Sequence, residues 1–160
     1  MRRVALTALA PLVLGLLFLS ASPLRADPGE ETPGAGAADS DYAAGKKAAE
    51  ARDWKGAIRL LGKAELQDDR NPDLQNLLGY AYRNSGNFDL AFKHYERALA
   101  LNPRHRGAHE YVGEAYLLVG NLVKAEEHLG ALRQICLIPC EEYADLKAKI
   151  DAYRRGPRAK

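Results

Sequence analysis

Apolar residues recur at helical intervals along most of the chain after residue 40, and short polar breaks separate them. Between 74 and 82 they follow a spacing of three and four residues, which is typical of an amphipathic helix. Asn84-Ser85-Gly86-Asn87 then interrupts the pattern with residues that favour turns. A second amphipathic segment begins at Phe88 and ends before Asn102-Pro103. Two helices joined by so short a turn pack antiparallel, so the pattern predicts a helical hairpin.

The hairpin pattern repeats with a period of 34 residues, as the spacing of Gly45, Gly79 and Gly113 shows. Several positions keep this register in three copies, which marks an internal repeat rather than a coincidence. Small residues fit where paired helices approach closely, and large ones fill the space between units. We expect repeats at about 38–71, 72–105 and 106–138. The repeat-packing residues are Gly45, Ala57, Gly79, Tyr82, Ala91, Tyr95, Gly113, Tyr116 and Ala125.

The second copy resembles the tetratricopeptide-repeat (TPR) family over nearly a whole unit. Gln75 stands where the family usually has Trp, and Ala48 replaces the aromatic residue in the first copy, which is the weakest. The resemblance implies an all-α, right-handed TPR solenoid of three helix-turn-helix repeats. The residues that carry it are Leu78-Gly79-x2-Tyr82, Ala91-x3-Tyr95, Ala98 and Pro103.

A further amphipathic segment follows the repeats, with an apolar stripe of Tyr143, Leu146, Ile150 and Tyr153. The last unit of a solenoid leaves an apolar face that needs a cap. We therefore expect a C-terminal capping helix at about 141–154. The TPR domain then covers 41–155, contains seven helices and is followed by a short tail at 156–160.

The N-terminus has the pattern of a secretory signal peptide. Arg2 and Arg3 precede the uncharged, Leu-rich stretch 4–19, and a small-residue segment ends at Ala26. We predict a signal peptide at 1–26 and a Sec-type route to the periplasm or beyond, with an uncleaved signal anchor as the alternative. Residues 27–40 are rich in Gly, Pro and small side chains, which predicts a flexible leader.

The charge of the chain is nearly balanced, with Lys+Arg 23 against Asp+Glu 21. Removal of 1–26 takes away three arginines and leaves 20 basic against 21 acidic residues. A protein that binds nucleic acid by charge shows a strong basic excess, so we expect no nucleic-acid partner. We also expect no membrane insertion after signal cleavage.

Cys136 and Cys140 are the only cysteines, and Pro139 lies between them. An even pair in an exported protein favours a disulfide, and residues four apart on a helix have Cα atoms about 6 Å apart, within bridging range. Free or regulatory thiols and a metal site are the alternatives. A thioredoxin-type site would need C-x-x-C at a helix N-terminus in an α/β fold. A disulfide here would fix the angle between the capping helix and the third repeat.

The four histidines are interpreted as surface residues. His105 and His109 have the spacing of a metal-binding pair on a helix, but no third ligand stands beside them. The chain shows no Ser/His/Asp arrangement, phosphate-binding loop or paired catalytic carboxylates. We therefore expect no enzyme activity, no cofactor and no metal.

The family resemblance implies that the first helix of each repeat lines a groove for a partner segment. Some family members bind a C-terminal carboxylate there with a clamp that Lys46 and Asn76 resemble, but Glu110 and Glu114 would repel it. The expected groove residues are Tyr42, Lys46, Asn76, Tyr80, Arg83, Asn84, Glu110, Glu114, Leu117 and Leu118.

This mixture of side chains suits a protein or peptide partner with aromatic or aliphatic anchors and some basic character. The functional hypothesis is a scaffold or adaptor in the bacterial cell envelope. The alternatives are a thiol-redox or metal-handling accessory protein that uses the two cysteines, a structural subunit of an envelope complex, and an inner face that binds nothing specific.

Overall fold

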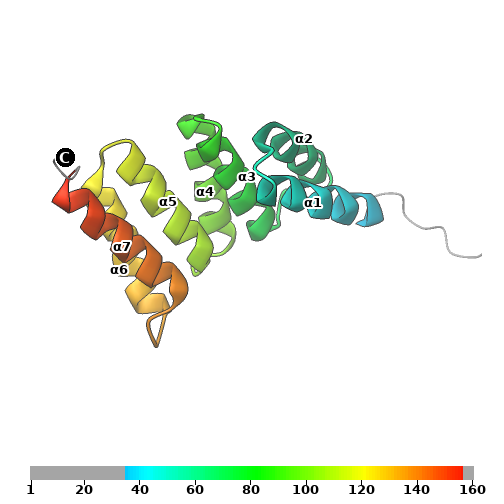
Figure 1. Cartoon of the computed structure of the whole chain (residues 1–160). Helices are drawn as coiled ribbons and strands as arrows, with labels where there is room; N and C mark the ends of the chain where they lie inside the picture. Colours follow the sequence, from blue (N-terminus) through cyan, green and yellow to red (C-terminus); the bar gives the residue numbers. More distant parts are fainter. Residues whose placement is uncertain (1–34, 157–160) are drawn as a thin grey trace, which may run out of the picture. The chain divides into compact units, whose positions relative to one another are not determined.

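The computed structural model describes residues 35–156, and these form seven α-helices and no strand (Figure 1). All of them belong to one compact unit of the chain, Thr32–Lys160. The predicted all-α fold and its seven helices are confirmed. The helices are α1 (Ala35–Glu50), α2 (Trp54–Glu65), α3 (Pro72–Asn84), α4 (Phe88–Leu101), α5 (Arg106–Leu118), α6 (Leu122–Ile135) and α7 (Glu141–Arg155).

The predicted signal peptide at 1–26, residues 27–34 of the predicted leader and residues 157–160 of the tail lie outside the described residues. Within the described part, no helix combines the length and the apolar character that crossing a bilayer requires.

The hairpins follow from turn and cap residues that repeat with the same register. Asp53, Asn87 and Asn121 each accept a hydrogen bond from the backbone N–H three residues on, which caps α2, α4 and α6. Gly86 and Gly120 have φ of 82° and 79° in the turns just before these caps. Such angles favour glycine because it has no Cβ. The first hairpin has Arg52 at the equivalent position, with φ of 59°, which fits its weaker match to the repeat pattern.

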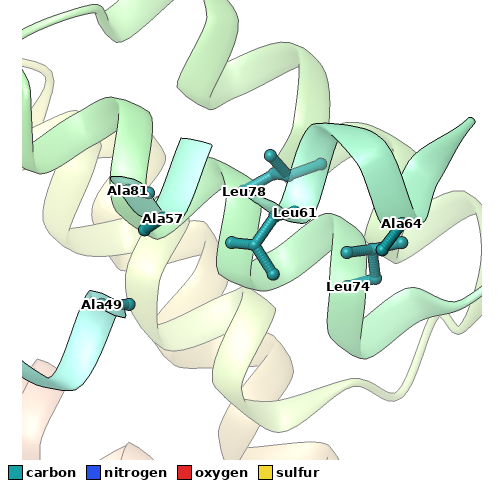
Figure 2. Packing of buried hydrophobic residues seen from close by; sticks show 7 residues of the cluster. All are labelled: Ala49, Ala57, Leu61, Ala64, Leu74, Leu78 and Ala81. Atoms are coloured by element: carbon teal, nitrogen blue, oxygen red, sulfur yellow. The ribbon is translucent and has the colours of Figure 1, made fainter. Parts of the chain in front are cut away.

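The small residues of the repeat mark close contacts between helices, as expected. A Cβ on Gly79 of α3 would lie 2.6 Å from ring carbons of Tyr95 of α4, whose side chain is fully buried. A Cβ on Gly45 of α1 would lie equally close to Leu61 of α2. Figure 2 shows the seven buried side chains of the first core cluster, which come from α1, α2 and α3: Ala49, Ala57, Leu61, Ala64, Leu74, Leu78 and Ala81.

The capping helix α7 packs against both helices of the third hairpin. A Cβ on Gly113 of α5 would lie 2.6 Å from Leu146 of α7, so the cap fills the space next to this glycine. Leu146 and Ile150 are buried together with Ala125 and Leu132 of α6. Tyr153, the last residue of the predicted apolar stripe, stays 43% exposed. The cap therefore contacts both helices of the third hairpin and leaves an aromatic ring at its edge.

The predicted start of the folded domain at residue 41 is wrong, because α1 begins at Ala35. The last part of the predicted leader, 35–40, therefore belongs to the first helix. Ala37 and Ala38 lie in this segment, and alanine has the highest helix propensity of all residues. The low content of large side chains that predicted a leader does not prevent a helix that continues into a packed hairpin.

Candidate functional site

A hollow of about 460 Å³ lies between α3, α5 and α7. Five of the predicted groove residues line it, and α7 contributes two more that the sequence interpretation did not include, Lys149 and Tyr153. Leu118 is 64% exposed at its border, so an apolar side chain there is available to a bound segment. The full lining is Arg83, Asn84, Glu114, Leu117, Leu118, Lys149 and Tyr153.

The charges at the bottom of the hollow are paired. The buried Arg83 donates a hydrogen bond to one carboxylate oxygen of Glu114 and another to the backbone oxygen of Tyr111 at 3.3 Å. Lys149 donates to the other oxygen of Glu114. Glu114 is only 8% exposed, so its charge is balanced by cations from the second hairpin and from the cap. Glu114 does line the hollow, but the expectation that it would repel a carboxylate is wrong, because its charge is already balanced.

Aromatic rings hold Arg83 in place. Its guanidinium carbon lies 5.2 Å from the ring centroid of Tyr80 and 5.3 Å from that of Tyr111, within the range of cation–π attraction. The two tyrosine rings are 5.0 Å apart, and Trp54 meets the Tyr80 ring edge-on at 5.6 Å. A row of three rings thus connects the first, second and third hairpins. Sequence reasoning placed Tyr80 here but missed Tyr111.

Glu110 differs from its predicted role as well. It is 8% exposed, and burial, then the neighbouring Glu114, raise its pKa to about 7, while Lys149 acts in the opposite direction. A carboxyl with this pKa carries only part of its charge near neutral pH. Glu110 therefore does not present the open acidic surface that would repel a carboxylate.

The remaining predicted groove residues are not all brought together. Tyr42 packs against the first core cluster and lines a small cavity with Ala64 and Leu74, so it does not line the hollow. Lys46 is exposed on α1, and Asn76 is half-buried with its Oδ1 enclosed and without a hydrogen-bond partner among residues 35–156. Neither residue lines the hollow.

Cys136 and Cys140 form a disulfide, with Cα atoms 5.9 Å apart, and neither thiol is free. The predicted pairing is confirmed, although the two residues do not share a helix. Cys136 is the C-cap of α6 and Cys140 the N-cap of α7, so the bridge closes the turn between them.

The histidines are not the surface residues that the sequence interpretation expected. Nδ1 of His94 donates a hydrogen bond to Oε1 of Gln75 at 2.8 Å, and Gln75 is the residue that stands where the family usually has Trp. The Nδ1 atoms of His109 and His128 lie 2.9 Å apart, while Nε2 of His109 contacts the Pro103 carbonyl oxygen at 3.1 Å. His105 caps α5 through Nδ1.

The pKa values of His94, His109 and His128 are lowered, mainly by burial, and that of His128 falls to about 4. These side chains are neutral polar links between helices. Among the described residues, no three His, Cys, Asp or Glu side chains are grouped so that they could hold a metal ion.

The profile of the family described as tetratricopeptide repeat matches residues 72–105. In sequence, the chain is similar to protein O-mannosyl-transferase TMTC3 of Homo sapiens, with 31% identity over 94 residues. The mouse protein (Mus musculus) is 30% identical over the same length. These matches cover 58% of this chain but span only about a tenth of the length of the relatives.

Solved structures share the fold. The translocator chaperone SycD of Yersinia enterocolitica type III secretion superposes with a TM-score of 0.66 at 18% identity, over 73% of this chain and 83% of SycD. The first TPR of Spaghetti (RPAP3), bound to the HSP90 peptide SRMEEVD, gives 0.66 at 22% identity, over 76% and 95%. PcrH in complex with the chaperone binding region of PopD gives 0.65 at 19%, over 73% and 90%.

Proposed function

Because the chain belongs to the tetratricopeptide-repeat family, we propose that it is a non-catalytic protein-interaction module that binds a segment of a partner protein in the hollow between α3, α5 and α7. The observation that carries this function is the exposure of Leu118 and Tyr153 around a concave surface whose charges are already paired. Similar folds support it, since RPAP3 and PcrH are each described in complex with a peptide or binding region of another protein.

The lining of the hollow selects the chemistry of the bound segment. Leu117, Leu118 and Tyr153 suit one large apolar side chain of the partner as an anchor. Lys149 and Arg83 carry two positive charges against the single carboxylate of Glu114, and half of the Lys149 side chain is exposed. A neutral or acidic residue next to the anchor therefore fits better than the basic one that the sequence interpretation favoured.

Leu118→Asp is expected to weaken binding of a segment in the hollow at least tenfold, because a desolvated carboxylate replaces an apolar contact. Peptides selected from a displayed library of random linear sequences on the wild-type chain serve as probes, and fluorescence anisotropy gives their Kd values. Leu66→Asp is the matched control, since Leu66 is 90% exposed but lies outside the hollow. Equal losses in both variants, or no loss in either, would argue against the hollow as the binding site.

The location of this function is outside the cytoplasm, in the bacterial cell envelope or beyond it. Two features support the proposal: the n-region and apolar stretch of residues 2–19, and a disulfide, which persists in oxidising compartments. N-terminal sequencing of the chain recovered from a periplasmic fraction is expected to begin at Asp27. A chain that stays in the cytoplasmic fraction with residues 1–26 attached would contradict export and leave the binding function untouched.

A further inference from the structure

We propose that the turn Cys136–Cys140, called here the disulfide loop, is a second binding surface that inserts Leu137 and Ile138 into an apolar cleft of a partner protein with a carboxylate beside that cleft. This surface is separate from the hollow between α3, α5 and α7, because none of its residues lines that hollow. The proposal therefore goes beyond the function of the hollow and does not depend on it.

The disulfide loop presents large apolar side chains to solvent. Leu137 is 100% exposed and Ile138 is 80% exposed, and Pro139 next to them is exposed as well. Figure 1 shows the turn between α6 and α7 projecting beyond the ends of both helices. Single exposed apolar residues are common on protein surfaces, but adjacent ones at the tip of a projecting turn indicate an interaction site.

The equivalent turns of the earlier repeats show whether the fold itself requires apolar residues at these two positions. The residues that precede Leu137 and Ile138 by one and two periods are Pro103-Arg104 and Asp69-Arg70. Asp69 accepts a hydrogen bond from Arg97 at 3.2 Å, so the earlier turn uses a polar contact within the array. The fold thus accepts polar residues at these turn positions. Leu137 and Ile138 are apolar for a reason other than packing of the hairpins.

The disulfide holds this apolar tip in one conformation. The bridge joins the residues on either side of Leu137-Ile138-Pro139, and Arg104 donates a hydrogen bond to the carbonyl oxygen of Ile135 at 3.4 Å. A loop that is already ordered loses less conformational entropy when it binds. The covalent constraint is therefore placed where it favours insertion into a partner.

Charge near the loop indicates what the partner carries. A second hollow of about 300 Å³ adjoins the loop and is lined by Arg133, Cys136, Leu137, Pro139 and Tyr143. Arg133 is exposed and makes no ion pair with another described residue, and Arg104 contacts the last residue of α6, Ile135, next to the loop. These cations are complementary to a carboxylate on the partner.

The same charges decide between possible occupants. A second copy of this chain would place its own Arg104 and Arg133 opposite these residues, with unfavourable like-charge contacts. A bilayer would be contacted by only two aliphatic side chains, and one small apolar signal gives marginal membrane binding. A protein cleft that is apolar with an acidic rim satisfies both the side chains and the arginines.

The test uses the full mature chain with Leu118→Asp as bait, so that the hollow is disabled. A phage-displayed library of folded domains whose surface clefts are randomised is selected on this bait and counter-selected on the same bait carrying Leu137→Ser and Ile138→Ser. We expect the recovered domains to have an apolar cleft with Asp or Glu at its rim. Their Kd on the otherwise wild-type chain should rise at least tenfold with the double serine replacement and about threefold with Arg133→Ala. Leu66→Ser is the control and should leave Kd unchanged.

The affected side chains are solvent-exposed, so each variant is expected to keep the wild-type helical circular dichroism spectrum. Recovery of no loop-dependent domain, or of domains without an acidic residue at the cleft, would overturn the proposal. So would loop-dependent binding to vesicles of phosphatidylcholine and phosphatidylglycerol, or a loop-dependent dimer in light scattering. Because the bait lacks a working hollow, these outcomes do not depend on whether the hollow binds a partner.

Discussion

Replacement of Glu114 by alanine is expected to lower the free energy of unfolding by about 3–5 kcal/mol. Glu114 balances the charge of Arg83, which is 9% exposed and has no other carboxylate partner among the described residues. Removal of the carboxylate leaves a buried guanidinium with only the Tyr111 carbonyl and two aromatic rings around it. The lost ion pair with Lys149 contributes less to this change, because half of the Lys149 side chain is exposed to water and its charge stays solvated. Urea denaturation followed by circular dichroism at the helical band measures the change.

Glu126→Ala is the matched control for this variant. Glu126 also accepts a hydrogen bond from an arginine, Arg154, but the side chains of that pair are 39% and 53% exposed, far more than those of Glu114 and Arg83. Exposed ion pairs contribute about 0–1 kcal/mol, so the control should change stability by no more than that. Similar losses in the two variants would mean that Glu114 has no special role in balancing a buried charge.

Gly79→Ala is expected to destabilise the protein by about 1–3 kcal/mol, although alanine usually stabilises a helix by about 1 kcal/mol relative to glycine. The new Cβ would lie 2.6 Å from two ring carbons of Tyr95, and this ring is fully buried. Either α3 and α4 move apart or the ring shifts against its own neighbours. The same urea titration measures the loss.

Gly130→Ala is the control, and its expected effect has the opposite sign. Gly130 lies inside α6, and a Cβ there would meet no heavy atom within 4 Å. Only the helix propensity changes, so stability should rise by up to about 1 kcal/mol. If both alanine variants shift stability in the same direction, close packing at Gly79 is not what selects glycine.

The sequence predicted the helices well because their signals are local or repeated. The turn residues Asn84-Ser85-Gly86-Asn87 end α3 and cap α4, and the same register marks the hairpin that follows. Three copies of one pattern make a weak motif specific. The leader boundary was wrong because residues 35–38 carry no apolar stripe, so only their helix propensity and their continuity with α1 could have indicated a helix.

The candidate site was predicted only in part, because its chemistry depends on contacts between units. Arg83 and Glu114 were expected as separate charges on an open surface, whereas they meet each other and Lys149 of the cap. No local pattern encodes this contact across three units. Tyr111 could have been found, since it lies one turn before Glu114 on the same helix.

The burial of the histidines could not be predicted from local sequence either. Histidine is intermediate between buried and exposed residue types, and His94 stands between the polar Lys93 and the buried Tyr95, so its neighbours did not decide its exposure. Its burial follows from Gln75, whose Nε2 donates to Glu65 at 2.9 Å and whose Oε1 meets the imidazole. The substitution of Gln75 for the usual Trp was visible in the sequence, and a polar residue at a packing position requires a polar partner.

The disulfide between Cys136 and Cys140 also determines what a protease could do to this protein. Exposed turns are preferred sites of cleavage, and Leu137 and Ile138 form the most exposed apolar turn in the described chain. A cut at any peptide bond between the two cysteines leaves α6 and α7 joined through their sulfur atoms. The cap then stays at high effective concentration beside α5 and α6 and keeps its buried Leu146 and Ile150 in place. The fold therefore tolerates a broken backbone at the position where it is most exposed to one.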